Sequence, residues 1–571
     1  MRYFALVTDY DGTLATQGIV DEDLLQTLAG LRGSGRRLVM VTGRELDDLQ
    51  RTFSHLEMFD RVVAENGALV YNPVTREEKV LCQKPREEFV ELLRRRGVDG
   101  LSVGRAIVAT WEPYEKIVLE AIRELGMELQ VIFNKGAVMV LPSGINKATG
   151  LKIALEELGI SPHNVVGVGD AENDHAFLDL CECSVAVANA LPMLKKGADF
   201  VTSEERGAGV SELARMIMDT DLRELEPRLR RHEVPLGTTA DRKELSISPY
   251  GASMLLAGTS GGGKSTFATG LLERLCERGY QFCIIDPEGD YQDFEAAVVL
   301  GDPKSPPLVD AVVRLMEKPA ENVVVNLLGL SLEHRPEFFD RLFPALLEMR
   351  TRTGRPHWIV IDETHHLLPA AWDPATVAIP ERLHSLLMIT VHPDHVSKAM
   401  LSTVDLIIAI GADPGRTIRT FSEALGETVP PVPDVELEQG EMIAWWRRRN
   451  GSAPFWFRSL PPKTERRRHR RKYADGELPP EGSFFFRGPD GKLNLRAQNL
   501  QMFLQIADGV DDDTWMFHLR KEDYSEWFKS RIKDPDLADA VKEIEKDNGI
   551  SPEESRKRIR EKVEERYTGE A

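Results

Sequence analysis

The sequence has little cysteine, no long apolar run and no excess of positive charge. Its 571 residues include five cysteines, at positions 82, 181, 183, 276 and 283. Their spacing fits neither a zinc site nor a disulfide framework, which favours a reducing compartment. No apolar run reaches the roughly 18 residues that a bilayer-spanning helix needs. The formal net charge of −20 argues against a protein that coats nucleic acid. We therefore expect a cytoplasmic protein with no membrane partner and, from its length, about three or four domains.

The first 223 residues alternate short apolar runs with amphipathic helices. Leu24, Leu25, Leu28 and Leu31 recur at helical spacing between two of these runs. This βαβ pattern predicts an α/β domain with a doubly wound, Rossmann-like sheet. An insertion over about residues 81–141 has its own α/β rhythm and predicts a small cap. The expected strands of the main sheet are Tyr3–Thr8, Leu38–Thr42, Val62–Ala64 and Val165–Val168.

Two carboxylates, Asp9 and Asp11, follow the first predicted strand. The carboxyl ends of the strands are where ligands bind in open α/β sheets. Asp9 can attack phosphorus and form an aspartyl-phosphate. Asp11, on the same side, can act as general acid for the leaving alcohol and then as base for water. The pair predicts a phosphatase nucleophile and its acid/base partner.

Further candidate residues follow later strands or begin a helix. Thr42 can hold a phosphoryl oxygen, and Lys147 can offset the charge of the transition state. Asp170 and Asp174 offer hard oxygen ligands suited to Mg²⁺. Asn173 can orient Asp174 or Lys147.

In this order the motifs resemble the haloacid dehalogenase superfamily, and within it the Cof-like sugar phosphatases and archaeal phosphoglycolate phosphatases. Residues 65–68, 146–147 and 189–190 are similar to further signatures of that branch. The resemblance implies Asp9 as nucleophile, Asp11 as acid/base, and Mg²⁺ held by Asp9, the backbone carbonyl of Asp11 and Asp170. It also implies a small phosphorylated substrate. Arg44 is open to two interpretations, a phosphate contact or a structural salt bridge.

A glycine-rich loop at residues 258–265 follows the predicted strand Ser253–Ala257 and precedes a predicted helix. Backbone N–H groups of such a loop surround a phosphate at the helix N-terminus. Lys264 can reach the β- and γ-phosphate oxygens, and Ser265 can help to hold Mg²⁺. The expected ATP-binding residues are Gly258, Ser260, Gly261, Gly262, Gly263, Lys264, Ser265 and Thr266.

Asp362 and Glu363 end another apolar run. Asp362 can complete the Mg²⁺ shell, and Glu363 can polarise the attacking water. Together with residues 285–291 and 362–367, these features resemble the HerA/FtsK-type translocase ATPases. That resemblance implies a RecA-like P-loop domain and hexameric rings. This sequence departs from the family at His392, where a glutamine sensor is usual.

Arg416 and Arg419 are candidate arginine fingers or ordinary surface arginines. A linker is expected at residues 224–243, the ATPase domain at 244–460, a basic linker at 461–482 and a helical module at 483–571. The basic run 466–472 can be a solvated linker, or a contact for nucleic acid or for an acidic neighbouring surface. His518 is expected to be a structural histidine. The helices expected in the module are Leu495–Ala507, Asp523–Ile532, Asp536–Lys546 and Pro552–Tyr567.

The sequence therefore predicts a Mg²⁺-dependent phosphomonoester hydrolase fused to an ATP-binding and ATP-hydrolysing domain. Its substrate is expected to be a small sugar or organic phosphate. The ATPase would regulate the phosphatase or assemble it into a homo-oligomer, with a hexamer as the expected form. One alternative is an oligomeric DNA translocase or defence-type ATPase whose phosphatase acts on nucleotides or nucleic-acid ends. Another is a nucleotide-sensing scaffold with vestigial catalysis.

Overall fold

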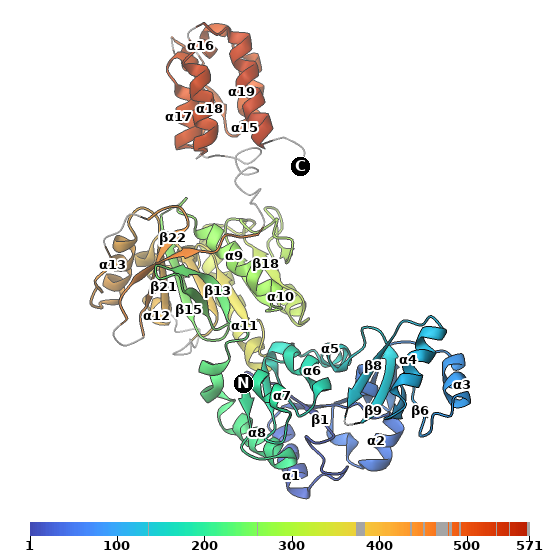
Figure 1. Cartoon of the computed structure of the whole chain (residues 1–571). Coiled ribbons are helices and arrows are strands. Elements are labelled where there is room, and N and C mark those ends of the chain that lie inside the picture. The colour runs from blue at the N-terminus through green and yellow to red at the C-terminus, as the bar shows by residue number, and fades with distance from the viewer. Residues whose placement is uncertain are drawn as a thin grey trace. The chain divides into compact units, whose positions relative to one another are not determined.

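The computed structural model describes the chain except for a set of short segments, which are residues 135, 260, 373–382, 434–436, 449–451, 464–477, 479–481, 490, 492, 533, 548 and 568–571. The chain divides into two compact units, Met1–Pro462 and Lys463–Ala571. Figure 1 labels their helices and strands. The first unit contains two large sheets and a small one, and the second is mainly helical. The α/β fold class predicted from the sequence is confirmed.

The first large sheet belongs to the predicted phosphatase. Its strand order is β12-β11-β10-β1-β2-β3-β4-β5. All neighbouring strands from β12 to β3 run parallel, and β4 and β5 continue the sheet as antiparallel strands. The strands are β1 (Ala5–Asp9), β2 (Arg37–Val41), β3 (Arg61–Ala64), β4 (Leu69–Asn72), β5 (Glu77–Val80), β10 (Val165–Gly169), β11 (Cys183–Ala186) and β12 (Phe200–Val201).

Helices connect the parallel strands of this sheet and bury their apolar faces against it. The leucines at helical spacing, from Leu24 to Leu31, are buried in the core, as their spacing predicts. The helices are α1 (Glu22–Gly33), α2 (Leu46–Thr52), α5 (Lys147–Leu158), α6 (His175–Leu180), α7 (Pro192–Gly197) and α8 (Arg206–Thr220).

The predicted cap forms a four-stranded antiparallel sheet of order β6-β7-β9-β8. One face of this sheet packs on α3 (Glu87–Arg95) and α4 (Glu115–Glu124) around Phe89 and Val118. Its other face places Met139 and Leu141 in a small cluster with Ala68 of the main domain. The strands are β6 (Ser102–Val103), β7 (Val108–Trp111), β8 (Leu129–Asn134) and β9 (Ala137–Pro142).

The second large sheet has the order β14-β13-β23-β22-β21-β15-β20-β19-β16-β18-β17. Strands β15 to β21 are parallel, and the remaining four extend one edge as antiparallel strands. The parallel strands are β15 (Ser253–Gly258), β16 (Phe282–Asp286), β17 (Val298–Leu300), β18 (Val323–Asn326), β19 (Trp358–Ile361), β20 (Leu386–Thr390) and β21 (Leu406–Ile410). The antiparallel strands are β13 (Val234–Thr239), β14 (Glu244–Ile247), β22 (Glu441–Trp446) and β23 (Phe455–Ser459).

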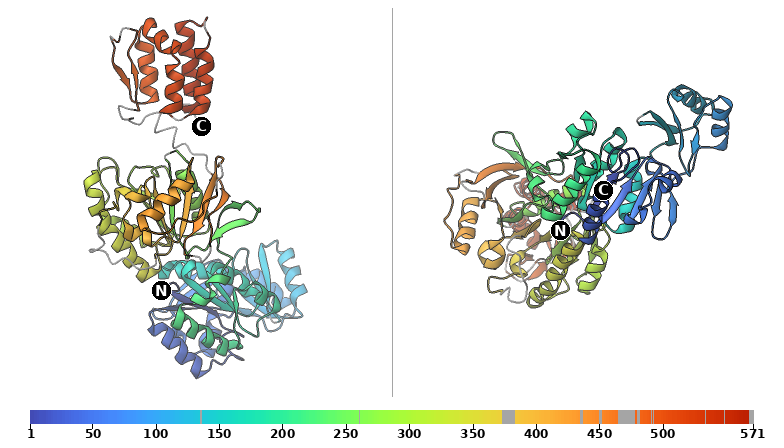
Figure 2. Two further views of the ribbon diagram at one scale, coloured as in Figure 1. Left: turned by 90° about the vertical axis from the view of Figure 1, so that its left-hand side faces the viewer. Right: turned by 90° about the horizontal axis from the view of Figure 1, so that it is seen from below.

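Helices cover both faces of this sheet, as the views in Figure 2 show. Alternate residues of β15 belong to two separate cores, with Leu255 in one and Leu256 in the other. Such a strand, buried on both faces, reads as a continuous apolar run, which is why the sequence revealed it. The helices are α9 (Lys264–Glu277), α10 (Val309–Met316), α11 (Arg335–Thr353), α12 (Lys398–Ser402) and α13 (Pro414–Leu425).

The expectation of an irregular linker at residues 224–243 was wrong for most of that segment. Leu225 and Leu229 are buried in the phosphatase core, and Val234–Thr239 forms β13 of the ATPase sheet. The charged residues that suggested a linker lie between these buried apolar positions. The five cysteines are free thiols in this structure.

The second unit begins with a hairpin of β24 (Phe484–Phe486) and β25 (Leu495–Ala497). The expected helix over Leu495–Ala507 was therefore wrong at its start. Asn499 explains the boundary, because its side chain accepts a hydrogen bond from the backbone N–H of Met502 and caps the helix that follows. The helices are α15 (Leu500–Gly509), α16 (Asp512–Arg520), α17 (Asp523–Ser530), α18 (Pro535–Glu545) and α19 (Pro552–Tyr567).

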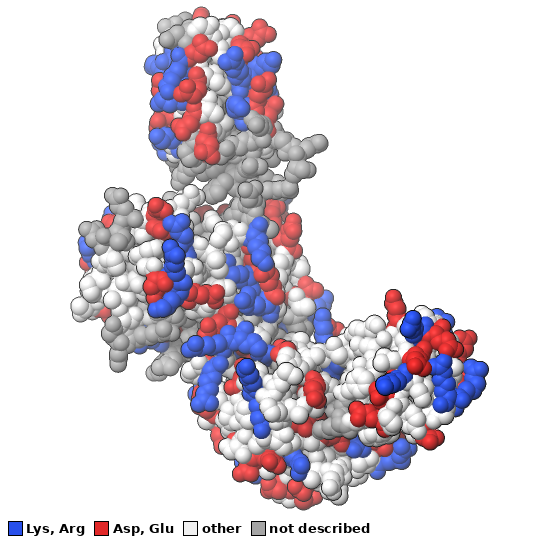
Figure 3. All heavy atoms as spheres, viewed as in Figure 1, with Lys and Arg blue, Asp and Glu red and all other residues white. Residues whose placement is uncertain are grey.

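His518 is a structural histidine, as expected. Its ring is buried, Nδ1 lies 2.7 Å from Asp523, and Nε2 accepts a hydrogen bond from the backbone N–H of Arg487. The basic run 466–472 lies outside the described residues. Among the described residues, no helix combines the length and the apolar character needed to cross a membrane. On the face shown in Figure 3, Lys and Arg side chains lie among Asp and Glu side chains on each unit.

Candidate functional site

Lys147, the first residue of α5, lies between two carboxylates at the carboxyl edge of the phosphatase sheet. Its Nζ donates to Oδ1 of Asp9 at 2.6 Å and to Oδ1 of Asp174 at 2.5 Å. The side chain is only 1% exposed, so its charge acts in a desolvated site. Asn146 caps α5 and fixes the turn that carries Lys147. A Cβ atom on Gly67 would lie 1.8 Å from the carbonyl oxygen of Asn146, so this approach requires glycine.

Asp174 is fully engaged in holding this arrangement. While Oδ1 accepts from Lys147, Oδ2 accepts from the backbone N–H groups of Asp170 and Ala171, both at 2.8 Å. Asp174 therefore positions Lys147 and shapes the loop after β10. Asn173, which the sequence suggested as a partner of Asp174 or Lys147, instead donates to Oδ1 of Asn66 at 3.1 Å.

The carboxylates of Asp9, Asp170 and Asp174 form a buried cluster, with one oxygen of each within 4.8 Å of the others. Burial raises the pKa of Asp9 to about 7, with the charges of Asp174 and Asp170 adding to the effect and Lys147 opposing it. Such crowded carboxylates favour a bound cation. The hard oxygen donors fit Mg²⁺, and Asp9 and Asp170 are the expected ligands because Asp174 is occupied by Lys147 and the loop amides.

Arg44 pairs with the predicted acid/base residue. Its Nε donates to Oδ2 of Asp11 at 2.6 Å and its Nη2 to Oδ1 at 2.7 Å, while Nη1 donates to Asp48 at 2.9 Å. Of the two interpretations of Arg44, the structure shows the salt bridge. Thr42 is buried at the end of β2, and its hydroxyl oxygen accepts from the backbone N–H of Arg44 at 3.2 Å.

Glu65 joins the cap to the main domain. This fully buried carboxylate accepts hydrogen bonds from the backbone N–H groups of Arg105, Ala106 and Ile107, at 2.9, 2.8 and 3.1 Å. Sequence reasoning gave Glu65 no role, although it lies in a segment that carried the family resemblance. Over the site itself, a Cβ atom on Gly43 would lie 3.6 Å from Sδ of Met139 in β9. The cap thus closes directly over the loop after β2, which favours small substrates.

The glycine-rich loop connects β15 to α9. Gly258 has φ +150° and a Cβ atom there would lie 1.9 Å from the carbonyl oxygen of Ile410, so the loop requires glycine at its start. Lys264 is buried, and its Nζ donates to the carbonyl oxygens of Gly258 and Thr259 at 3.0 and 3.2 Å. Gly261, Gly262 and Gly263 complete the loop, Ser265 and Thr266 lie in the first turn of α9, and Ser260 lies outside the described residues.

Asp362 and Glu363 follow β19, as predicted. Burial, with the charges of Asp286 and Glu363, raises the pKa of Asp362 well above its usual range. Glu363 has φ +39°, a left-handed conformation that is uncommon in a residue other than glycine. Nδ1 of His365 lies 3.5 Å from Oε2 of Glu363 and 3.1 Å from Oγ1 of Thr390. Sequence reasoning missed the contact of His365 with Thr390, because these two residues are distant in sequence.

His392 stands where the related ATPases usually have a glutamine sensor, and a second histidine, His365, lies close to it. The rings of His365 and His392 lie 5.9 Å apart, and the backbone N–H of His392 donates to Oγ1 of Thr390 at 3.1 Å. His392 therefore belongs to the surroundings of Glu363. Arg416 and Arg419 are exposed on α13.

Comparison with known proteins agrees with both halves of this description. Residues 6–106 and 106–213 match the haloacid dehalogenase-like hydrolases, and residues 238–348 match the central domain of helicase HerA. A phosphoglycolate phosphatase of Methanothermobacter thermautotrophicus is 31% identical over 223 residues, which are 38% of this chain and 98% of that protein. Phosphoglycolate phosphatase 2 of Saccharolobus solfataricus is 30% identical over 221 residues, 37% of this chain and 91% of that protein.

Among solved structures, a haloacid dehalogenase-like hydrolase from Bacteroides thetaiotaomicron aligns with a TM-score of 0.34 and 22% identity, over 38% of this chain and 99% of that one. The two family models and the similar phosphoglycolate phosphatases confirm the two family resemblances drawn from the sequence.

Proposed function

We propose a phosphatase function from the premise that the chain belongs, over residues 6–213, to the haloacid dehalogenase-like hydrolase family. The proposed reaction is the Mg²⁺-dependent hydrolysis of a small phosphomonoester. The observation that carries it is the position of Lys147, which joins Asp9 to Asp174 beside Asp170 in a buried site. The buried cluster combines the carboxylate proposed as the nucleophile, the charged side chain of Lys147 and further carboxylate oxygens, and this combination supports the proposal.

The reaction proceeds in two steps. Asp9 attacks phosphorus, the bond from phosphorus to the alcohol oxygen breaks, and Asp11 donates a proton to that oxygen. A water molecule then gives a proton to Asp11 and attacks the aspartyl-phosphate, which releases phosphate and restores Asp9. Lys147 and the hydroxyl of Thr42 stabilise the phosphoryl oxygens. When bound, Mg²⁺ supplies positive charge beside Asp9 and Asp170 that offsets the charge of the phosphoryl group.

The substrate we propose is a small phosphorylated organic acid or sugar. The closed position of Met139 over the loop after β2 supports a small leaving group. The names of the similar archaeal proteins, phosphoglycolate phosphatases, support a short phosphorylated acid. A screen of phosphoglycolate, sugar phosphates and nucleotides, with Mg²⁺ or with a chelator, tests this proposal. Activity that persists in Asp9→Asn, or that needs no divalent cation, would contradict it.

The second part of the chain is proposed to bind and hydrolyse ATP. The loop from Gly258 to Ser265, with Lys264 at its end, would hold the phosphates, and Ser265 and Asp362 would hold Mg²⁺. Glu363 would polarise the attacking water. The match to the HerA central domain supports this assignment. Equilibrium binding of a fluorescent ATP analogue and steady-state release of phosphate test its two steps separately.

A translocase is the second candidate function, and the same match to the HerA central domain favours it. In that case the chain would form a homo-oligomer, with a hexamer as the expected form, and exposed Arg416 or Arg419 on α13 would reach the nucleotide of a neighbouring subunit. Light scattering with and without ATP tests the assembly. Stimulation of ATP turnover by DNA separates a translocase from a local regulator of the phosphatase. A cytoplasmic location stays a prediction.

A further inference from the structure

The phosphatase and ATPase sheets contact each other through residues that precede their strands. The side chains of Asn164 and Glu182, which come before β10 and β11, meet those of His357 and Tyr280, which come before β19 and β16. The guanidinium of Arg2, just before β1, lies 3.9 Å from the centre of the Tyr250 ring, just before β15. The candidate catalytic groups follow the opposite, carboxyl ends of these strands. Each active site therefore lies at the far side of its own sheet from the contact.

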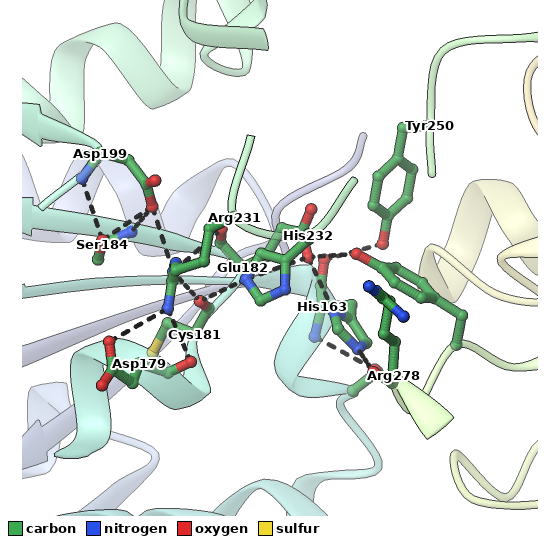
Figure 4. A network of polar contacts seen from close by, with 12 residues as sticks. His163, Asp179, Cys181, Glu182, Ser184, Asp199, Arg231, His232, Tyr250 and Arg278 are labelled. Atoms are coloured by element: carbon green, nitrogen blue, oxygen red, sulfur yellow. Dashed lines mark hydrogen bonds and ion pairs between the residues drawn. The ribbon is translucent and has the colours of Figure 1, made fainter. Parts of the chain in front are cut away.

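A buried network of polar groups from both parts of the chain lies within this contact (Figure 4). Glu182, 1% exposed, accepts from Nη2 of Arg2 at 2.8 Å and from the hydroxyl of Tyr280 at 2.9 Å. Nδ1 of His163 lies 2.7 Å from Glu182, and Nε2 lies 2.5 Å from the carbonyl oxygen of Arg278. The His163 ring also stacks on that of Tyr280. Two hydrogen bonds of this network cross the contact, from Tyr280 to Glu182 and between His163 and the carbonyl oxygen of Arg278.

The same network has the residue types of a metal site, because His163, Glu182 and His232 place one ligand atom each within 4.8 Å of the others. The distances argue against that use. Two ligands of one tetrahedral zinc ion lie about 3.3 Å apart, since each bond is about 2.0–2.1 Å long. Nδ1 of His163 and Oε2 of Glu182 are 2.7 Å apart, which is a direct hydrogen bond. The cluster is an interface between the two parts of the chain.

One hydrogen bond lies at the centre of the contact. The backbone N–H of Gln281 donates to Nδ1 of His357 at 2.8 Å, so the proton of the ring is on Nε2. Burial, with the charges of His163 and Arg355, lowers the pKa of His357 well below its usual range, so the ring is neutral. Nε2 then donates to Oδ1 of Asn164, 3.2 Å away.

The residues around this hydrogen bond are tightly packed. The Nδ2 group of Asn164 donates to the carbonyl oxygen of Arg2 at 2.9 Å, which fixes the orientation of the amide. A Cβ atom on Gly354 would lie 2.3 Å from that amide nitrogen. Nη2 of Arg355 donates across the contact to the carbonyl oxygen of Gly159 at 3.1 Å. A movement of the segment before β19 must therefore move Asn164 as well.

The two strands that begin at this bond end at the two candidate sites. Asn164 leads through β10 to Asp170 in the phosphatase, and His357 leads through β19 to Asp362 in the ATPase. Both strands are buried along their whole length, so each moves as a rigid element. The bond between Asn164 and His357 thus directly links the starts of two strands whose other ends carry expected Mg²⁺ ligands.

We propose that the nucleotide held at the glycine-rich loop changes the turnover of the phosphatase through the contact of His357 with Asn164. Each site keeps its own substrate, because the candidate catalytic groups of each sheet lie at the edge opposite the contact. Binding of Mg²⁺ and nucleotide beside Asp362 would shift β19, and His357 would pass the shift to β10 and Asp170. This inference rests on the proposed phosphatase and ATP-binding functions.

The test uses two variants of His357 in the full chain. In His357→Asn the side-chain oxygen can replace Nδ1 and accept from Gln281, while the donor to Asn164 is lost. In His357→Gln the side-chain amide can replace Nε2 and donate to Asn164, while the acceptor for Gln281 is lost. Hydrolysis of p-nitrophenyl phosphate is measured without nucleotide, with ADP and with a non-hydrolysable ATP analogue. Basal turnover and nucleotide affinity are measured for each variant and show that it is folded.

We expect nucleotide to change the phosphatase turnover of the parent by roughly fivefold or more, the lower end of typical couplings between sites. The change should persist in His357→Gln and disappear in His357→Asn. An undiminished response in His357→Asn would overturn the assigned contact. If the parent protein binds nucleotide but hydrolyses p-nitrophenyl phosphate at the same rate with and without it, the coupling is overturned and the proposed functions stay intact. A parent that shows no phosphatase activity or binds no nucleotide would overturn the proposed functions and the coupling with them.

Discussion

Arg44 forms a bidentate salt bridge with Asp11 at the edge of the phosphatase site. Its Nε lies 2.6 Å from Oδ2 and its Nη2 lies 2.7 Å from Oδ1. Its third nitrogen binds Asp48, and its guanidinium lies 5.3 Å from the centre of the Tyr10 ring. The residue expected to move protons during the reaction is thus fixed by a cation that is itself fixed from two sides. We therefore expect Arg44 to act on the reaction through Asp11, as a positioning residue.

Replacing Arg44 should therefore harm the step in which Asp11 gives up a proton. In Arg44→Gln we expect turnover of an alkyl phosphate to fall by on the order of tenfold to a hundredfold, within the range of general acid catalysis. Turnover of p-nitrophenyl phosphate should fall much less, because its leaving group needs no proton. Arg215→Gln, which breaks an exposed ion pair with Asp23, serves as the control. Equal losses for the two substrates would mean that Arg44 acts on phosphate binding or on the fold.

Binding of Mg²⁺ should compete with a proton on Asp9. In the metal-free protein burial raises the pKa of Asp9 from its ordinary 3.8 to about 7. A raised pKa stabilises the folded protein below pH 3.8, and this stabilisation is lost as the pH rises through about 7. Mg²⁺ requires the ionised carboxylate, so it should raise the melting temperature more at pH 8 than at pH 6. In Asp9→Asn any shift caused by Mg²⁺ should no longer depend on pH. A parent with equal shifts at both pH values would contradict the prediction.

The phosphatase site could be predicted in large part because its residues follow buried strands. A strand covered on both faces appears in the sequence as an apolar run, and the residue after it lies at the catalytic edge. Asp9, Thr42 and Asp170 were placed correctly at the ends of β1, β2 and β10 by that reasoning. Their chemical roles stay predictions.

What the sequence could not show are the contacts between distant segments. The pairing of Arg44 with Asp11, the bonds from Glu65 to the cap and the contact of Asn164 with His357 join residues with no common local pattern. The antiparallel strands β13 and β22 were missed as well, although each is six residues long. Such elements are specified by tertiary pairing more than by their own propensity.

Glu65 should govern how firmly the cap is held. Its carboxylate accepts hydrogen bonds from three backbone N–H groups. In Glu65→Gln an NH₂ group replaces one carboxylate oxygen, so the backbone N–H groups facing it lose their acceptor. We expect the free energy of unfolding to fall by about 1–3 kcal/mol, which is the cost of leaving a buried donor without an acceptor. Hydrogen exchange of the amides of residues 105–107 should accelerate, and KM for small substrates should rise. Glu57→Gln, at an exposed position, is the control. Unchanged exchange at these three amides would show that the cap is held by other contacts.

Two substitutions should separate nucleotide binding from hydrolysis. Lys264→Ala removes the cation that reaches the phosphates, so nucleotide affinity should fall by roughly tenfold to a hundredfold. Glu363→Gln keeps the size of the side chain but cannot accept a proton from water, so ATP should still bind while turnover falls by roughly a hundredfold or more. Asp9→Asn is the matched control, because it changes the other site and should leave both ATP measurements unaltered. Calorimetric binding and phosphate release distinguish the two effects. If Lys264→Ala and Glu363→Gln both hydrolyse ATP like the parent, then the loop after β15 and the glutamate after β19 are not the ATPase site.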